Sequence, residues 1–240
     1  MSVGEVMSLL WNRRARSGIG QKISEEQGAL VMAPRWLDQF VNRVDDLRND
    51  AFLYNIRPKA EDMASTKQGA VLILLHDGAQ GPEVLITLRS EGLRSHGGQP
   101  SFPGGALESG ESAIDAALRE SAEEVGLTSA SVDVIAELPQ LFIPPSNFHV
   151  TPIVSYWREP HPLTTDASDE VMRAELIALD ELANPANRIM LRHRSGYRGP
   201  AFDVAGMRIW GFTGGILDRL LHHAGFEREW ERERTVELEP

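Results

Sequence analysis

The chain has 240 residues, 42% of them hydrophobic, and its 24 Lys and Arg against 35 Asp and Glu give a formal net charge of -11. This length predicts one large globular domain. The acidic balance argues against nucleic-acid polymers and anionic membranes as partners, because both select a surplus of Lys and Arg. Cysteine is absent, which excludes disulfides and thiolate chemistry and favours a cytoplasmic location.

The sequence divides into three predicted parts. Residues 1–30 lack a sustained hydrophobic period and are predicted to be a flexible N-terminal arm. Residues 31–226 are predicted to form a single domain with a helical extension at its start. Residues 227–240 form a strongly charged C-terminal tail, which is expected to be a frayed helix end or disordered. No stretch approaches the ~18 apolar residues of a membrane helix, so we expect a soluble protein.

The domain shows mixed helical and strand periods. A helix is predicted after Pro34, where apolar residues recur at helical spacing. Short apolar runs predict strands, the first two of them joined as a hairpin at Gly81-Pro82. The predicted strands are residues 70–75, 84–88, 132–138, 150–157 and 174–179. A final helix is predicted over residues 209–223, and the order of elements indicates an α/β fold.

One further helix, over residues 112–125, is predicted with its boundaries. Ser109 or Ser112 can cap its N-terminus, and Gly126 can end it in the left-handed conformation. Its apolar or small face is expected to contain Ile114, Ala117, Leu118, Ser121 and Val125. A Gly- and Pro-rich stretch, residues 97–110, precedes it and is predicted to be a functional loop.

Three carboxylates project from this helix within roughly a third of its circumference: Glu120, Glu123 and Glu124. Like charges at these spacings repel by ~0.2 to 0.5 kcal/mol per pair. A hard divalent cation that prefers oxygen ligands, Mg²⁺ or Mn²⁺, would turn this repulsion into a binding site. Taken alone, the cluster is more typical of a solvated acidic face than of a metal site.

The spacing around the cluster resembles the Nudix signature, G-x5-E-x7-R-E-U-x-E-E-x-G-U with U an apolar residue. Five residues separate Gly105 from Glu111 and seven more precede Arg119, after which the chain reads Glu120-Ser121-Ala122-Glu123-Glu124-Val125-Gly126-Leu127. Ser121, in an apolar position, is the one departure. The resemblance implies a Nudix fold, an α/β/α sandwich with a mixed sheet, and a metal-dependent pyrophosphohydrolase.

The resemblance also assigns roles to the matching residues. The metal ligands are expected to be Glu120, Glu123, Glu124 and the Gly105 carbonyl. Arg119, counted with the catalytic group, is expected to pair with Glu111 and hold the loop to the helix.

The residue that prepares the attacking water stays open. One of the three glutamates of the helix, or a later carboxylate such as Asp169 or Glu170, could deprotonate or orient the water.

Upstream, residues 85–105 resemble the longer motif of the coenzyme A branch of Nudix hydrolases, L-L-T-x-R-[SA]-x3-R-x3-G-x3-F-P-G-G. The matches are Thr87, Arg89, Ser90, Arg94, Gly98, Phe102, Pro103, Gly104 and Gly105. Ile86 replaces a leucine conservatively, and Pro100 stands where a β-branched residue is common. The resemblance implies hydrolysis of coenzyme A or acyl-CoA to 3′,5′-ADP and (acyl-)4′-phosphopantetheine.

Candidate contacts to such a substrate are Arg89, Arg94, Gln99, Phe102 and Gly104. Either arginine could bind the 3′-phosphate bidentately, although an arginine at a strand end often forms a structural ion pair instead.

Further along, His96 is expected to make an ordinary polar contact. Phe148 and His149 either line the adenine or pantetheine pocket or pack in the core or on the surface.

Two other interpretations remain open at this point. The enzyme could act on ADP-ribose, NADH, a dinucleotide or an oxidised nucleotide. Alternatively, the chain could be a regulator that binds a nucleotide without turnover, which would be expected to have lost one of the three helix glutamates. The family resemblance also makes a homodimer plausible.

Overall fold

The computed structural model describes residues 34–51, 53, 67–92, 97–165, 169–194 and 196–238. The chain divides after Ala33, and all described residues belong to the second unit, Pro34–Pro240. The expected N-terminal arm therefore lies outside the described residues, as do Arg94 and His96, and the domain boundaries stay a prediction. In the described ranges, no helix is both long and apolar enough to cross a membrane.

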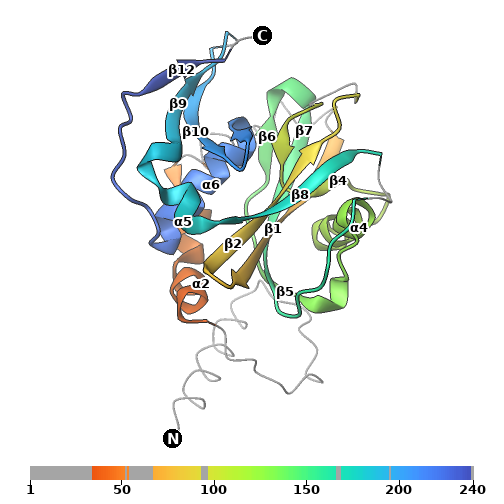
Figure 1. The fold of residues 1–240 in the computed structure, drawn as a ribbon. Helices are drawn as coiled ribbons and strands as arrows, with labels where there is room; N and C mark the ends of the chain where they lie inside the picture. The colour runs from red at the N-terminus through yellow and green to blue at the C-terminus, as the bar shows by residue number, and fades with distance from the viewer. Residues whose placement is uncertain are drawn as a thin grey trace, which may run out of the picture. The chain divides into compact units, whose positions relative to one another are not determined.

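The helices and strands follow one another in a mixed order (Figure 1). The α-helices are α2 (Arg35–Arg48), α4 (Ala113–Val125), α5 (Leu179–Ala183) and α6 (Gly211–Ala224). Short 3-10 turns are η2 (Ser129–Ser131), η3 (Pro144–Ser146) and η4 (Pro185–Asn187). The strands are β1 (Lys67–Gly78), β2 (Gly81–Arg89), β3 (Pro100–Ser101), β4 (Gly104–Ala106), β5 (Val132–Glu137), β6 (Leu141–Ile143), β7 (Phe148–Trp157), β8 (Val171–Ala178), β9 (Arg188–Arg192), β10 (Arg198–Val204), β11 (Met207–Ile209) and β12 (Thr235–Glu237).

The larger sheet has the strand order β3-β2-β1-β7-β5, and β4, β6 and β8 pair with β1, β7 and β2. It is mixed, because β1 runs parallel to β7 while its other pairs are antiparallel. The predicted hairpin is confirmed, with Leu75 opposite Val84 and Gly78 opposite Gly81. All five predicted strands correspond to strands of this sheet: β1, β2, β5, β7 and β8.

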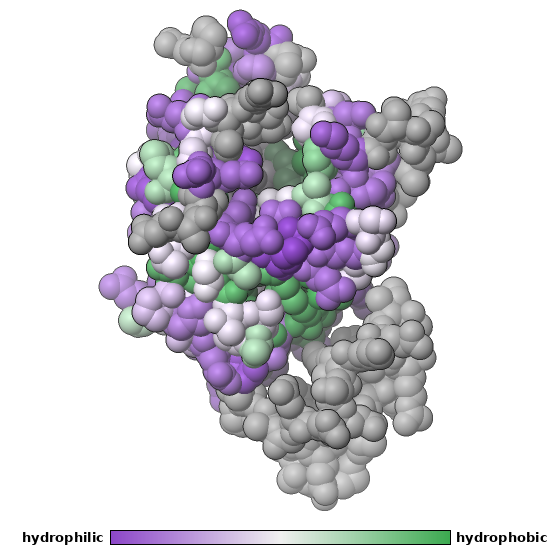
Figure 2. All heavy atoms as spheres, turned by 90° about the vertical axis from the view of Figure 1, so that its right-hand side faces the viewer, coloured by the Kyte–Doolittle hydropathy of each residue, from purple (hydrophilic) through white to green (hydrophobic). Residues whose placement is uncertain are grey.

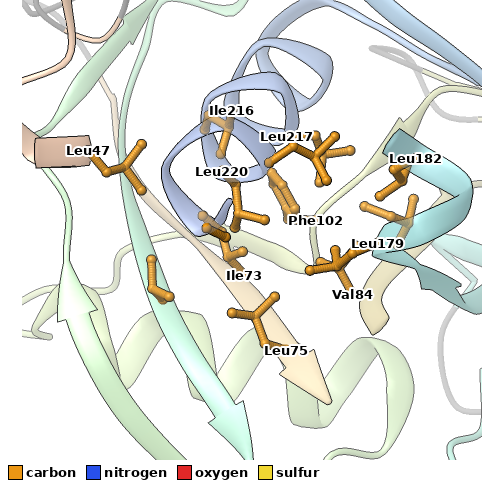
Figure 3. Close-up of a cluster of buried hydrophobic side chains, with 14 of the residues drawn as sticks. Leu47, Ile73, Leu75, Val84, Phe102, Leu179, Leu182, Ile216, Leu217 and Leu220 are labelled. Carbon is orange, nitrogen blue, oxygen red and sulfur yellow. The ribbon is translucent and has the colours of Figure 1, made fainter. Parts of the chain in front are cut away.

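Helices cover both faces of the larger sheet, which confirms the predicted α/β/α sandwich (Figure 1). On one face, α4 packs on the alternate residues of β1 that point toward it. This cluster contains Ala70, Leu72, Leu74, Leu85, Ala116, Ala117, Val125, Leu127, Ile153 and Trp157. On the other face, α2 and α6 pack on the opposite set of strand residues. That cluster includes Phe40, Leu47, Ile73, Leu75, Val84, Ile86, Ile216, Leu217 and Leu220, several of which Figure 3 shows.

The predicted caps of α4 are confirmed. The Ser112 hydroxyl accepts a hydrogen bond from the Asp115 backbone N–H at 3.1 Å, which satisfies one of the unpaired donors of the first turn. Gly126 ends the helix with φ 68°, in the left-handed region. Ser121, the departure from the signature, is fully buried and donates to the Ala117 carbonyl at 2.6 Å. A serine is therefore accommodated at this buried position without an unsatisfied hydroxyl.

A second sheet, with the order β11-β10-β9-β12, was not predicted. The expectation that the acidic tail frays or is disordered is wrong for its described part, because β12 runs parallel to β9 with Val236 opposite Leu191. Trp230 is 8% exposed, so the charged segment before β12 is anchored by one large buried ring. The composition of the tail did not predict this strand, because strand formation depends on the partner strand more than on the residues themselves.

Two predicted boundaries also change in the second half of the chain. Leu179 begins α5 instead of ending β8. Ile209 ends β11, and the last helix therefore begins two residues later, at Gly211.

Candidate active site

The loop before α4 is tied to that helix by one arginine. Arg119 donates from Nε and Nη2 to the two carboxylate oxygens of Glu111, at 2.9 and 3.0 Å, and from Nη2 to the Ala106 carbonyl at 3.0 Å. This bidentate pair confirms the contact that the sequence predicted. It also holds the pKa of Glu111 below its ordinary value and raises that of Arg119.

The same guanidinium faces two of the three helix carboxylates. Arg119 Nη1 lies 3.0 Å from Glu120 Oε1 and 3.4 Å from Glu123 Oε2. The Glu120 carboxylate occupies the space that a Cβ at Gly105 would need, so a glycine in β4 lets this carboxylate approach the strand. Burial raises the pKa of Glu120, although Arg119 opposes that shift.

Glu124, the third carboxylate, points into the protein. Its side chain is 6% exposed, and Oε2 accepts a hydrogen bond from the Gly104 N–H at 3.0 Å. Burial raises its pKa to about 7, while the Gly104 N–H and the Arg89 guanidinium act in the opposite direction. A positive charge brought to this carboxylate would therefore be favoured.

Arg89 links Glu124 to a carboxylate that is distant in sequence. At the end of β2, its Nη1 lies 3.7 Å from Glu124 Oε1 and its Nη2 donates to Glu170 Oε2 at 3.1 Å. The Ser90 N–H also donates to the Glu170 carbonyl at 2.8 Å. The structure thus brings Glu170 to the helix glutamates, whereas its neighbour Asp169 is exposed and has no comparable contact among the bonds described here.

Residues 66–198, more than half of the chain, match the profile of the NUDIX domain family. The chain belongs to the Nudix hydrolase family. It is thus a hydrolase of phosphorus anhydrides that acts on a nucleoside diphosphate derivative, and the family generally uses divalent metal ions.

Two relatives at 35% identity agree with this membership. The chain is 35% identical over 195 residues to an "Uncharacterized Nudix hydrolase NudL" of Enterobacter sp. (strain 638), and the match covers 76% of this chain and 97% of the relative. It is also 35% identical over 156 residues to "Nudix hydrolase 3" of Caenorhabditis elegans, covering 58% of this chain and 65% of that relative's length. Among solved structures, the Nudix hydrolase RenU of M. Smegmatis is 20% identical to this chain, with a TM-score of 0.45. The match covers 69% of this chain and 90% of the RenU chain.

The Nudix glutamates are not gathered into one cluster as the structure places them. Glu123 has a 61% exposed side chain facing Arg119, whereas Glu124 turns inward to Gly104. Across the described residues, no three acidic or histidine side chains lie close enough together to form a metal shell. The candidate ligand atoms are nevertheless all oxygens, which suits a hard divalent ion. Burial raises the pKa of both Glu120 and Glu124, so a cation brought to these carboxylates would be favoured.

The predicted substrate contacts fall into different environments. Arg89 and Gly104 both touch Glu124, and Gln99 lies beside them because its carbonyl accepts from the Arg89 N–H at 3.2 Å. Phe102 was expected to contact substrate, but its side chain is 2% exposed and packs in the core near α6 (Figure 3). That expectation is wrong for the Phe102 side chain, because apolar packing has withdrawn the ring from the surface.

The aromatic residues at the start of β7 also separate. His149 is fully buried, 5.2 Å from the Phe142 ring, which favours the core alternative for this residue. Phe148 is partly exposed, and the ammonium of Lys67 lies 5.7 Å from the centre of its ring. Lys67 was missed by the sequence analysis. The signal that could have found it is a single cation placed directly before a buried apolar strand.

Glu120, Glu123 and Glu124 lie on the side of the molecule that carries α4 (Figure 1). Figure 2 looks at that side, and hydrophilic residues gather across its middle next to hydrophobic surface. Such a mixture suits a ligand that carries both charged and apolar groups.

Proposed function

We propose that this Nudix hydrolase cleaves the diphosphate of coenzyme A or acyl-CoA to 3′,5′-ADP and (acyl-)4′-phosphopantetheine. The observation that carries the proposal is the position of Arg89, a residue of the coenzyme A motif. Its guanidinium contacts Glu124 and Glu170 at once, so the substrate motif and the signature helix form one site. Thr87 of the same motif is fully buried and donates to the Ser101 carbonyl at 3.0 Å, which holds β2 against β3 beside that site.

The proposed metal ligands are Glu120, Glu123, Glu124 and the Gly105 carbonyl, and the proposed ion is Mg²⁺ or Mn²⁺. When bound, the ion would polarise the phosphoryl oxygens, offset charge on the leaving phosphate and lower the pKa of a coordinated water. In this proposal Glu123, the most exposed of the three, exchanges its contact with Arg119 for the ion.

The surrounding residues prepare the carboxylates for this task. Arg119 keeps the loop that presents Gly105 against α4, because its guanidinium bonds Glu111 and the Ala106 carbonyl together. Arg89 holds Glu170 beside Glu124, and Glu170 is our candidate for orienting or deprotonating the attacking water.

Arg89 therefore has a positioning role in the proposal. The substrate contact first expected of it would require its carboxylate partners to be exchanged for phosphate. Cytoplasmic location and a homodimer stay as predictions beside this function.

One assay tests the substrate assignment. Purified protein is incubated with Mg²⁺ or Mn²⁺ and, separately, coenzyme A, acetyl-CoA, ADP-ribose, NADH, a diadenosine polyphosphate and an oxidised nucleoside triphosphate. Release of 3′,5′-ADP from coenzyme A substrates alone, abolished by EDTA, is the expected result. Equal turnover across the panel would contradict the narrow assignment, and no turnover of any compound would favour a regulator.

A further inference from the structure

A lone cation stands next to the candidate active site on the opposite face of the sheet. Side chains alternate along β1, so Ala70 and Leu72 face α4 whereas Lys67 and Gly69 face the other way. The carboxylates of α4 meet β4 on the first of these faces. Lys67 and the carboxylates therefore lie on different faces of β1.

Phe148 connects Lys67 to the loop of the proposed metal ligands. Strands β1 and β7 run side by side (Figure 1), and in their parallel pairing Lys67 is directly opposite Phe148. A Cβ added at Gly69 would lie 3.0 Å from Phe148 Cδ1 and 2.8 Å from the Gly105 carbonyl oxygen. The ring therefore stands beside Gly105 while it holds the ammonium of Lys67 near its face.

This cation differs from the two site arginines in its partners. Arg89 and Arg119 are both engaged by carboxylates. Within the described ranges, the Lys67 ammonium forms no ion pair, and it lies over the Phe148 ring. It is exposed, so an incoming anion need not displace a carboxylate from it.

We infer that Lys67 binds the 3′-phosphate of the substrate and that Phe148 positions the lysine for this contact. The inference rests on the proposed function, in which the diphosphate lies at the carboxylates on the α4 face. The anion that Lys67 would bind from the opposite face is then the 3′-phosphate, which is not cleaved. A phosphate monoester is a compact dianion, which a lysine ammonium can bind as a point charge.

The central test compares coenzyme A with dephospho-coenzyme A, which differ only in the 3′-phosphate. Lys67→Met keeps the apolar stem and removes the charge. We expect its KM for coenzyme A to rise about ten- to a hundredfold, because a charge-assisted contact is lost. The KM for dephospho-coenzyme A and both kcat values should stay at the wild-type level.

Three further variants sharpen the comparison. Arg198→Met removes one exposed positive charge from β10 in the second sheet and should leave all constants unchanged. Lys67→Arg should retain most of the preference for coenzyme A. Phe148→Leu keeps an apolar side chain without the ring, and we expect a smaller rise in KM for coenzyme A only, about two- to fivefold.

Binding of the product separates this inference from the proposed function. By calorimetry, wild-type protein should bind 3′,5′-ADP more tightly than AMP, and Lys67→Met should abolish that difference. If wild-type protein cleaves no coenzyme A, the proposed function fails. If it does cleave coenzyme A but Lys67→Met behaves like wild type, or weakens both substrates equally, the assignment of Lys67 to the 3′-phosphate is overturned.

Discussion

Glu124 is a carboxylate that the fold has taken out of water without giving it a full counter-charge. Its remaining contacts are a backbone N–H and a guanidinium 3.7 Å away. Glu123, one residue earlier, is largely exposed. In the proposed metal site, the two residues would therefore offer one fixed carboxylate and one adjustable carboxylate.

Replacing either of these glutamates should abolish most turnover. For Glu123→Gln and Glu124→Gln, we expect kcat to fall on the order of a thousandfold, because a neutral amide is a poor ligand for a hard cation. Steady-state kinetics at saturating Mg²⁺ measures the loss, and circular dichroism checks the fold. Glu229→Gln, an exposed carboxylate in the C-terminal segment, is the matched control. Wild-type rates in either site variant would contradict the metal assignment.

Glu170 and Asp169 form a natural pair for testing the proposed base. Only Glu170 is bonded to Arg89, so we expect Glu170→Gln to lower kcat about a hundredfold and Asp169→Asn to leave it unchanged. The metal concentration needed for half-maximal activity should stay similar in both. An unchanged kcat in Glu170→Gln would remove this residue from the mechanism.

At the scale of elements, the loop and helix act together because one arginine joins them. Arg119 contacts the loop at Glu111 and the Ala106 carbonyl and the helix at Glu120. A comparable arginine, Arg158, joins Asp133 to the Ala130 carbonyl elsewhere in the fold. The two differ in what they hold in place.

We expect Arg119→Ala and Arg158→Ala to lower the midpoint of thermal unfolding to a similar extent. Only Arg119→Ala should also lower kcat/KM, by about tenfold or more, because misplacing a catalytic group slows the reaction steeply. Differential scanning fluorimetry and initial rates give the two readouts. Full activity in Arg119→Ala would show that the loop keeps its position without this tie.

Sequence patterns predicted the elements whose signals are local. The caps Ser112 and Gly126 and the face containing Ser121 specify α4 within one stretch of chain. The direction in which the three glutamates leave the helix follows from their sequence positions and from helical geometry alone. By contrast, β9 pairs with a strand that lies beyond α6, and no local period reports such a partner.

The same distinction explains the candidate site. The contact between Arg89 and Glu170 depends on the register of β2 with β8, and the contact between Lys67 and Phe148 depends on that of β1 with β7. These registers cannot be read from the local patterns of a single sequence. Phe102 was misjudged for a related reason, because a motif position says nothing about which side of the loop faces the core.

At the scale of the whole molecule, a buried arginine joins the second sheet to α6. Arg188 of β9 is fully buried, and its guanidinium forms an ion pair with Asp218 of α6. Phe202 and Trp230 place their rings 5.1 and 4.3 Å from the same guanidinium. Burial lowers the pKa of Arg188, and Asp218 opposes that shift, so removing Asp218 would leave a poorly compensated charge.

We expect Asp218→Ala to lower the free energy of unfolding by about 3 to 5 kcal/mol, the range found when one partner of a buried pair is removed. The exposed pair of Arg192 and Glu237 is the matched control, and Glu237→Ala should change stability by about 1 kcal/mol or less. Urea unfolding followed by Trp fluorescence measures both. A small effect of Asp218→Ala would mean that water or another acceptor replaces the carboxylate.

The pairing of β12 with β9 also bears on the order in which the protein is assembled during synthesis. Residues of β9 leave the ribosome before α6 and well before Thr235–Glu237. The larger sheet and α4, which carries the signature glutamates, can therefore form while the edge of β9 that pairs with β12 is still unpaired. A free strand edge can pair with other chains, so slow or interrupted translation past Trp230 should promote aggregation even though every residue of the candidate active site has already been made.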